Sequence, residues 1–245
     1  FMYCRFVPYL KTLAKKVVFI VQDELYELVK SSNISEGIEV FSSRTNLDEI
    51  DFDLHMALLD VPCVCNINSE YLPYSDKYLD VSENQVMEYK TKYLLNSRKM
   101  KVGIAYQGSK SANYNRRDID FSRFGRLFQL ENIEFYSFVL EEEADDRIIY
   151  LGKTFNNFTD TASAIKNMDL MISTDNVILN LSGALGVKTY GLFNKYPNFR
   201  WFKLIGHNVG WYDSVVPLQV DENNCWADVF SELIKILSEN SKNKF

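Results

Sequence analysis

The residues best placed to do chemistry lie in segment 169–192, where an apolar run ends in a Ser-Thr-Asp-Asn sequence at 173–176. The pattern predicts a buried strand that ends there and a helix that follows directly. In an open parallel sheet, ligands bind outside the carboxyl ends of the strands, where a helix N-terminus offers N–H groups and a positive dipole end to a phosphate. We therefore expect Thr174, Asp175 and Asn176 to face an anionic ligand. A capped core helix that ends at a glycine would explain the same residues.

A second polar segment, residues 107–117, follows another predicted strand at 101–106. It carries Gly108, Ser109 and Arg117, and backbone amides together with a guanidinium can hold a diphosphate. Neither the Walker A spacing nor a G-x-G-x-x-G sequence is present, so NAD or FAD binding has little support. A solvated polar turn is the alternative. Because two such loops would follow strands of one sheet, each strengthens the case for the other.

The third candidate is segment 51–62, D-F-D-L-H-M-A-L-L-D-V-P. If residues 52–59 form a strand, Asp53 and His55 share one face of it. A histidine beside a carboxylate can act as a general base, which makes these two residues the catalytic candidates. A lone histidine is more often a structural hydrogen-bonding residue, and that alternative stays open. No carboxylate pair predicts a glycosidase.

Hydrophobic periodicity predicts a helix–strand rhythm in the first part of the chain, which is typical of a parallel sheet. The expected elements are a helix over 2–15, a buried strand over 17–21, a helix over 23–29 and strands over 38–41 and 52–59. A helix that starts after Ser82 and ends near Asn96 connects this series to the next. Its polar tail is the predicted boundary between domains 1–97 and 98–245.

The second part of the chain predicts a doubly wound layout, with strands separated by helices and short loops. The expected strands are 101–106, 133–139, 170–173 and 188–193, and the expected helices are 121–130, 161–167 and 177–185. An amphipathic helix over 227–237 closes the chain. The aromatic residues Phe199, Trp201, Trp211 and Tyr212 could stack on a sugar or a base, although core packing is the alternative for at least two of them.

Composition narrows the classes of function. The 245 residues include 27 Lys plus Arg and 33 Asp plus Glu, a net charge of −6, which argues against sequence-independent nucleic-acid binding. No apolar run reaches the roughly 18 to 20 residues of a membrane span, and the N-terminus lacks the order of a signal peptide. The four scattered cysteines suit a reducing cytoplasm, and with two histidines they predict no metal site. The chain begins with Phe rather than Met, as a piece of a longer polypeptide would.

The three candidate segments, 51–62, 107–117 and 169–192 in their order along the chain, resemble bacterial glycosyltransferase family 9, the ADP-heptose:lipopolysaccharide heptosyltransferase superfamily. The specific match is S-T-D-N-V-I-L-N-L-S-G-A-L-G at 173–186, which is similar to the family's S-V-D-T-x-x-A-H-L-A-G-A-L-G. The branch found as a C-terminal module after tetratricopeptide repeats is the more similar one. Weaker similarities cover F-M-Y-C-R-F-V-P-Y-L at 1–10, F-D-L-H-M-A-L-L-D-V-P at 52–62, K-V-G-I-A-Y-Q-G-S at 101–109, R-D-I at 117–119, D-T-A-S-A-I at 160–165, F-R-W-F at 199–202 and W-Y at 211–212.

The resemblance implies an α/β, GT-B-like fold: two Rossmann-like domains with parallel sheets face a cleft, the N-terminal one incomplete here, and the C-terminal helix crosses back to it. It implies a metal-independent glycosyltransferase that takes a sugar from a nucleoside diphosphate of the ADP or UDP type and needs no further cofactor. The acceptor is a glycan, a lipid or a protein. We expect a cytoplasmic protein without a nucleic-acid partner. Peripheral membrane attachment, a protein partner and an upstream tetratricopeptide-repeat region stay open.

The resemblance also assigns roles to individual residues. The residues that follow 174 would meet the diphosphate or sugar, those of the 107–117 loop would hold phosphate, and those near 160 would lie beside the nucleoside. His55 would face the cleft from the N-terminal domain. The expected donor-site residues are Gly108, Ser109, Arg117, Asp160, Thr161, Ile165, Thr174, Asp175, Asn176 and Asn180.

The chain departs from the family pattern at two of these positions. Asn176 and Asn180 stand where the family has Thr and His, and Asn can donate a hydrogen bond but cannot titrate near neutrality. The family also places a G-x-G-D loop, whose Asp is the usual base candidate, before the point at which this sequence starts. A catalytically degenerate binding module is therefore the alternative to a transferase, and a sugar-nucleotide epimerase is a third interpretation.

Overall fold

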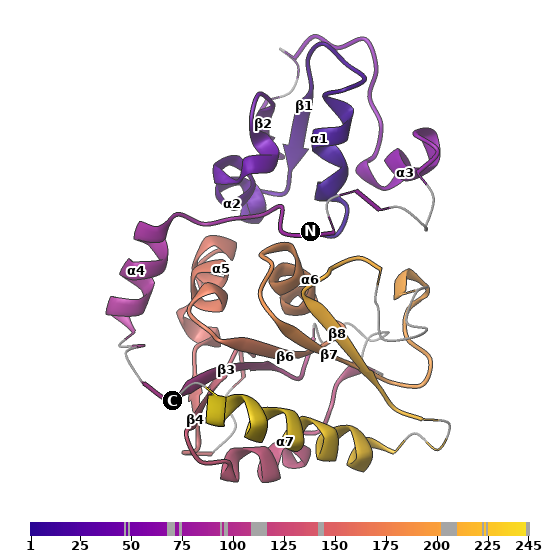
Figure 1. Ribbon diagram of the computed structural model, residues 1–245. Coiled ribbons are helices and arrows are strands. Elements are labelled where there is room, and N and C mark those ends of the chain that lie inside the picture. Colours follow the sequence, from indigo (N-terminus) through magenta and orange to yellow (C-terminus); the bar gives the residue numbers. More distant parts are fainter. Residues whose placement is uncertain are drawn as a thin grey trace.

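The computed structural model is a mixed α/β protein with one six-stranded and one two-stranded parallel sheet (Figure 1). Within the described residues, no helix combines the length and the apolar character that a membrane crossing requires. The structure describes residues 1–46, 48, 50–67, 72–73, 75–93, 95, 98–108, 117–141, 145–201, 210–221, 223 and 225–243.

The six-stranded sheet has the strand order β5-β4-β3-β6-β7-β8, and every neighbouring pair is parallel. Numbered along the chain, this order is 3-2-1-4-5-6, which is the doubly wound order of the Rossmann fold. The order reverses between β3 and β6, where Ala105 lies opposite Ser173. The strands are β3 (Met100–Ala105), β4 (Ile133–Ser137), β5 (Ile148–Tyr150), β6 (Leu170–Thr174), β7 (Thr189–Phe193) and β8 (Val215–Gln219).

The four strands predicted for this part of the chain are confirmed, and the sequence missed β5 and β8. Both are the edge strands of the sheet. β5 has three residues, too few for a periodic signal, and β8 contains Pro217, which argues against a central strand. An edge strand tolerates proline because one side of its backbone needs no hydrogen-bond partner. Pro217, which argued against a central strand, is therefore compatible with an edge strand.

Helices cover both faces of this sheet. On one face lie α4 (Glu83–Lys92), α5 (Phe158–Lys166) and α6 (Val177–Ala184), and on the other lie the 3-10 helix η6 (Phe121–Gln129) and α7 (Trp226–Asn243) (Figure 1). The expected crossing of the last helix to the N-terminal part is wrong. Phe230, Leu233 and Leu237 of α7 are buried in one cluster with η6 and the sheet, because they form an apolar stripe that the sheet face covers.

The N-terminal part is built around a smaller sheet, in which β1 (Val18–Val21) pairs with β2 (Glu39–Ser42). The predicted 2–15 helix is shorter, and its α-helical part ends at Leu10. The buried strand is confirmed as a strand, although Ile20 is 43% exposed. The remaining elements are η1 (Cys4–Phe6), α1 (Val7–Leu10), η2 (Asp23–Leu25), α2 (Tyr26–Ser31), η3 (Asn33–Ser35), η4 (Leu58–Asp60) and α3 (Val61–Val64).

The N-terminal part shares its core with the six-stranded sheet's helices. Phe6 and Leu28 belong to the same buried cluster as Ala162 of α5 and Leu179 of α6. The connecting chain reinforces the junction, since the N–H groups of residues 78 and 79 both donate to the carbonyl oxygen of the last α6 residue, at 2.9 and 3.0 Å. The boundary near residue 97 stays a prediction.

Arg5 is buried at the junction between the N-terminal part and the rest of the chain. Its side chain is fully buried, and its guanidinium lies 4.9 Å from the ring centroid of Tyr78, 5.3 Å from that of Trp211 and 5.0 Å from that of Tyr212. Cation–π attraction is strongest where the cation is desolvated. The three rings come from the connecting segment and from the chain before β8, so Arg5 ties the N-terminal helix to both.

Candidate functional site

A cavity of about 1150 Å³ lies at the carboxyl edge of the six-stranded sheet. Its walls come from the segments that follow β3, β4, β5, β6 and β7, which is where parallel α/β sheets bind ligands, and from residues 1–3, Glu24 and Leu59 of the N-terminal part. Its lining includes the aromatic rings of Phe138, Phe155 and Phe158 as well as charged and polar groups. The charged and polar lining residues include Arg117, Asp175, Asn176, Asn180, Asn198 and Arg200.

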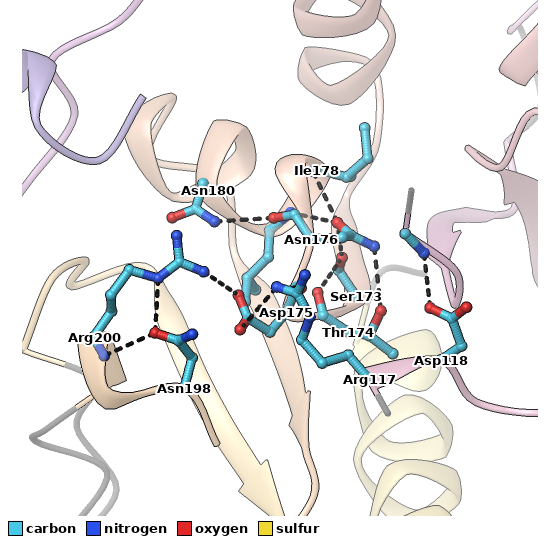
Figure 2. A network of polar contacts seen from close by, with 12 residues as sticks. Arg117, Asp118, Ser173, Thr174, Asp175, Asn176, Ile178, Asn180, Asn198 and Arg200 are labelled. Carbon is cyan, nitrogen blue, oxygen red and sulfur yellow. Dashed lines mark hydrogen bonds and ion pairs between the residues drawn. The ribbon is translucent and has the colours of Figure 1, made fainter. Parts of the chain in front are cut away.

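Asp175 lies between two arginines of the cavity lining (Figure 2). Arg117 Nη1 lies 3.2 Å from its Oδ2 and donates to its backbone oxygen at 2.8 Å, and Arg200 Nη2 lies 3.6 Å from its Oδ1. The residue is only 4% exposed, yet neither carboxylate oxygen accepts a hydrogen bond of good geometry from the described residues. A buried carboxylate without such donors retains the capacity to accept hydrogen bonds from a ligand's hydroxyl groups.

Asn176 is fully engaged inside the protein. Its Oδ1 accepts hydrogen bonds from the N–H groups of Ile178 and Leu179 at 2.8 and 3.2 Å, which makes it the N-cap of α6. Its Nδ2 donates to the carbonyl oxygens of Ala105 and Gln107 at 3.3 and 3.2 Å. One side chain therefore joins the ends of β3 and β6 to the helix, and two of the helix-end donors expected for a phosphate are already used.

Asn180 and Tyr212 continue this network toward the N-terminal part. Asn180 Nδ2 donates to the Asn176 carbonyl oxygen at 2.9 Å, and its Oδ1 accepts from the Tyr212 hydroxyl at 3.0 Å. Burial raises the pKa of Tyr212 well above its ordinary value, so the hydroxyl stays protonated and remains a donor. Gly183 makes this packing possible, because a Cβ there would lie 2.4 Å from Cγ of the Tyr212 ring.

The loop after β3 is closed at its base. The Gly108 N–H donates to Asp118 Oδ1 at 2.9 Å, and the Ile119 N–H donates to the Tyr106 carbonyl oxygen at 3.0 Å. The structure therefore places Arg117 beside Asp175 but uses the Gly108 amide within the loop. Ser109, the third residue expected here, lies outside the described residues.

The α5 candidates divide between the cavity and the core. Thr161 lines the cavity, and its hydroxyl donates to the Asn157 carbonyl oxygen at 3.2 Å. Asp160 Oδ2 accepts from the backbone and side-chain nitrogens of Asn156, both at 2.9 Å. Ile165 is completely buried in the apolar core and does not line the cavity. Thr174 is also buried, and its hydroxyl donates toward the Ala105 carbonyl oxygen at 3.4 Å.

The two catalytic candidates lie elsewhere. The predicted strand over 52–59 is wrong: residues 50–57 form neither helix nor strand, and η4 begins at Leu58. Asp53 and His55 are exposed, the His55 ring packs against Phe52 at 5.5 Å, and neither residue lines the cavity. Among the described residues, no strand pairs with this alternating segment. A catalytic role for these residues stays a prediction.

Arg200 and Asn198 are site residues that the sequence analysis did not single out. Asn198 Oδ1 accepts from the Arg200 backbone N–H and Nε, both at 3.1 Å, and the Arg200 carbonyl oxygen accepts from Trp211 Nε1 at 2.7 Å. The sequence did carry a signal for them, because both residues follow a predicted strand, the one over 188–193 that forms β7. Among the aromatic candidates, Trp201, Trp211 and Tyr212 are buried and pack in the core.

The residues that the structure describes include no cluster of metal ligands. No group of three or more His, Cys, Asp or Glu side chains is placed to hold an ion, and all four cysteines are free.

Comparison with solved structures identifies the class of fold. The chain is similar to a glycosyl transferase of family 9 from Veillonella parvula, with a TM-score of 0.65, 12% identity, and coverage of 97% of this chain and 94% of that one. It is also similar to ADP-heptose LPS heptosyltransferase II of E. coli, with a TM-score of 0.64, 10% identity, and coverage of 98% and 95%. The predicted GT-B-like fold class is thereby confirmed. No protein-family model and no curated protein sequence matches the chain.

Proposed function

We propose that the protein is a glycosyltransferase that binds a nucleoside-diphosphate sugar in the cavity at the carboxyl ends of β3 and β6. The observation that carries this proposal is the position of Asp175 and Arg117 at the point where the strand order reverses. Arg117 would neutralise a phosphate, and the unsatisfied Asp175 carboxylate would accept hydrogen bonds from sugar hydroxyls. The fold shared with two glycosyltransferases adds support.

The aromatic rings that line the same cavity suit the nucleoside. The ring centroids of Phe138 and Phe155 lie 5.4 Å apart. The Phe158 ring packs edge-on against Phe1, with 5.0 Å between the centroids. A base can stack on such rings, while the ribose and diphosphate extend toward Arg117. Transfer builds negative charge on the departing diphosphate, and a fixed guanidinium stabilises that charge without a metal. We propose an ADP- or UDP-type donor, and a glycan, lipid or protein as acceptor.

The test is thermal unfolding with ADP, UDP, GDP and CMP and their common sugar conjugates. A ligand that binds only the folded state stabilises it by about 2.7 kcal/mol at 100 times its Kd, so one nucleotide is expected to raise the Tm selectively. Asp175→Ala and Arg117→Ala are expected to abolish the rise. Arg147→Ala is the matched control, because it breaks an ion pair with Asp145 (2.5 Å) outside the cavity. Unchanged nucleotide binding in both site variants would refute the assignment.

A second candidate is a binding module that has lost catalysis. It is favoured by the internal use of Asn176 and Asn180 and by the fact that neither Asp53 nor His55 lines the cavity. This alternative predicts nucleotide or partner binding without release of nucleoside diphosphate from any sugar conjugate. Measuring that release with and without candidate acceptors separates the two proposals.

A further inference from the structure

Two arginines approach one carboxylate in the cavity from opposite loops. Arg117 follows β3 and Arg200 follows β7, and Asp175 lies between them (Figure 2). One carboxylate and two guanidinium groups carry a net charge of +1. The Arg117 and Arg200 side chains are 24% and 32% exposed, against 4% for Asp175, so a ligand in the cavity can reach both cations.

The Arg200 side chain is held in place before any ligand arrives. Asn198 Oδ1 accepts from both its backbone N–H and its Nε, which fixes the first part of the guanidinium. Trp211 anchors the same residue through its carbonyl oxygen. A pre-positioned guanidinium loses less conformational freedom when it binds an anion, so this arrangement favours recognition over mere solvation.

The backbone donors that usually bind phosphate at this edge of a sheet are used internally. The Ile178 and Leu179 N–H groups bind Asn176 Oδ1, and the Gly108 N–H binds Asp118. With these three backbone donors engaged, the described side chains gain importance for binding negative charge in the cavity. Arg117 and Arg200 are the arginine or lysine residues on the described part of the wall, and its acidic residues besides Asp175 are Glu24 and Glu141. The arginine pair is therefore where an anionic group of a ligand is expected to bind.

We propose that Arg200 is a specificity residue that, together with Arg117, makes the cavity prefer diphosphates over monophosphates. This inference rests on the proposed function for the nucleoside part of the ligand, but not for the diphosphate part. Guanidinium groups on two sides of Asp175 can each hold one phosphoryl group of a diphosphate. A monophosphate can engage only one of them, so loss of Arg200 affects it less.

The experiment measures Kd by calorimetry for inorganic pyrophosphate, for the nucleoside diphosphate selected by the thermal panel and for the matching monophosphate. Arg200→Ala is expected to weaken pyrophosphate and diphosphate binding by at least about tenfold, and monophosphate binding by no more than about threefold. Arg200→Lys keeps the charge but loses the fork held by Asn198, and an intermediate loss is expected. Arg147→Ala is the control that removes an arginine from an ion pair elsewhere.

The outcomes separate this inference from the proposed function. Equal weakening of monophosphate and diphosphate in both Arg200 variants would overturn it, because the residue would then act through the shape of the site. Diphosphate binding that is unchanged by either substitution would overturn it and leave the donor site standing. Pyrophosphate binding that depends on Arg200, without binding of any nucleotide, would support it and refute the nucleotide-sugar proposal. A wild-type chain that binds neither pyrophosphate nor nucleotide would overturn both.

Discussion

Two regions of this molecule carry polar residues that promise chemistry, and they differ in how those residues are held. At the carboxyl ends of β3 and β6, Asp175 and Asn176 are buried and linked to neighbouring segments by hydrogen bonds and ion pairs. In the irregular segment before η4, Asp53 and His55 are exposed beside apolar side chains that are also exposed, with Leu54 at 86%. Polar residues that follow a buried, paired strand are thus held in place, and polar residues that alternate with apolar ones in an irregular segment are not.

The difference shows what positions a functional side chain. β3 and β6 pair with each other and with β4 and β7, so their ends are fixed by two neighbours each. The segment before η4 pairs with no strand in the described part of the chain. A residue type and its spacing therefore predict a site only where an independent signal, such as a fully apolar strand, predicts the pairing. The following predictions test this contrast, starting with the largest effect.

Substitution of Gly183 is expected to damage the first region most. In Gly183→Ala, the new Cβ would lie 2.4 to 2.7 Å from three carbons of the Tyr212 ring, which must then move away from Asn180. Overpacking of this kind lowers the free energy of unfolding by about 3 kcal/mol, more than the gain in helix propensity. Urea unfolding measures the loss. Gly125→Ala is the matched control, because no atom lies within 4 Å of its Cβ, and its stability is expected to stay the same or rise slightly. Equal losses in both variants would contradict the packing argument.

The two asparagine N-caps give a finer comparison. Asn157 caps α5 through one hydrogen bond to the Asp160 N–H at 2.9 Å, whereas Asn176 caps α6 and also binds the Ala105 and Gln107 carbonyl oxygens. We expect Asn157→Ala to cost about 1 kcal/mol and Asn176→Ala about 2 kcal/mol or more, since the second substitution also leaves buried carbonyl groups without donors. Asn176→Asp keeps the cap but sets a buried carboxylate oxygen against the Ala105 and Gln107 carbonyl oxygens, so a loss at least as large as that of Asn176→Ala is expected. Equal losses at the two caps would show that the link between strands contributes nothing.

The buried tyrosines predict how the junction responds to alkali. Burial raises the pKa of both Tyr78 and Tyr212 in the folded protein. The unfolded chain loses these protons near pH 10, while the folded chain keeps them to higher pH. Stability from this source is therefore complete below about pH 10 and is lost as the pH rises through the folded pKa. Tyr212→Phe is expected to lower the Tm at pH 7, because the bond to Asn180 is lost, and to flatten its fall above pH 10. An unchanged slope in this variant would argue against a protonated, buried hydroxyl.

Much of the six-stranded sheet could be predicted from the sequence, because its central strands are mostly apolar and are separated by capped helices. The same strands predicted that Arg117 and Asp175 come together. The partners of Asn176 could not be predicted, since they depend on the register between β3 and β6. Arg200 follows the predicted strand over 188–193, but its place beside Asp175 depends on the strand order that puts β7 next to β6. In the N-terminal part, the elements are short, and the alternating pattern of segment 52–59 predicted a strand. Whether such a pattern forms a strand depends on pairing with a neighbouring strand, which the sequence does not show.

The smallest expected effect comes from the exposed segment, and it tests the comparison from the other side. Leu54 is 86% exposed and Leu179 is fully buried, so the same change from leucine to serine should cost at most about 0.5 kcal/mol at the first position and about 3 kcal/mol or more at the second. His55→Ala should leave both stability and nucleotide affinity unchanged, because the ring contacts Phe52 and does not line the cavity. A large loss in Leu54→Ser would mean that this segment packs against something in solution. If His55→Ala abolished sugar transfer while leaving nucleotide affinity intact, the residue would act on the acceptor, and the contrast between a built site and an unsupported one would hold for the donor alone.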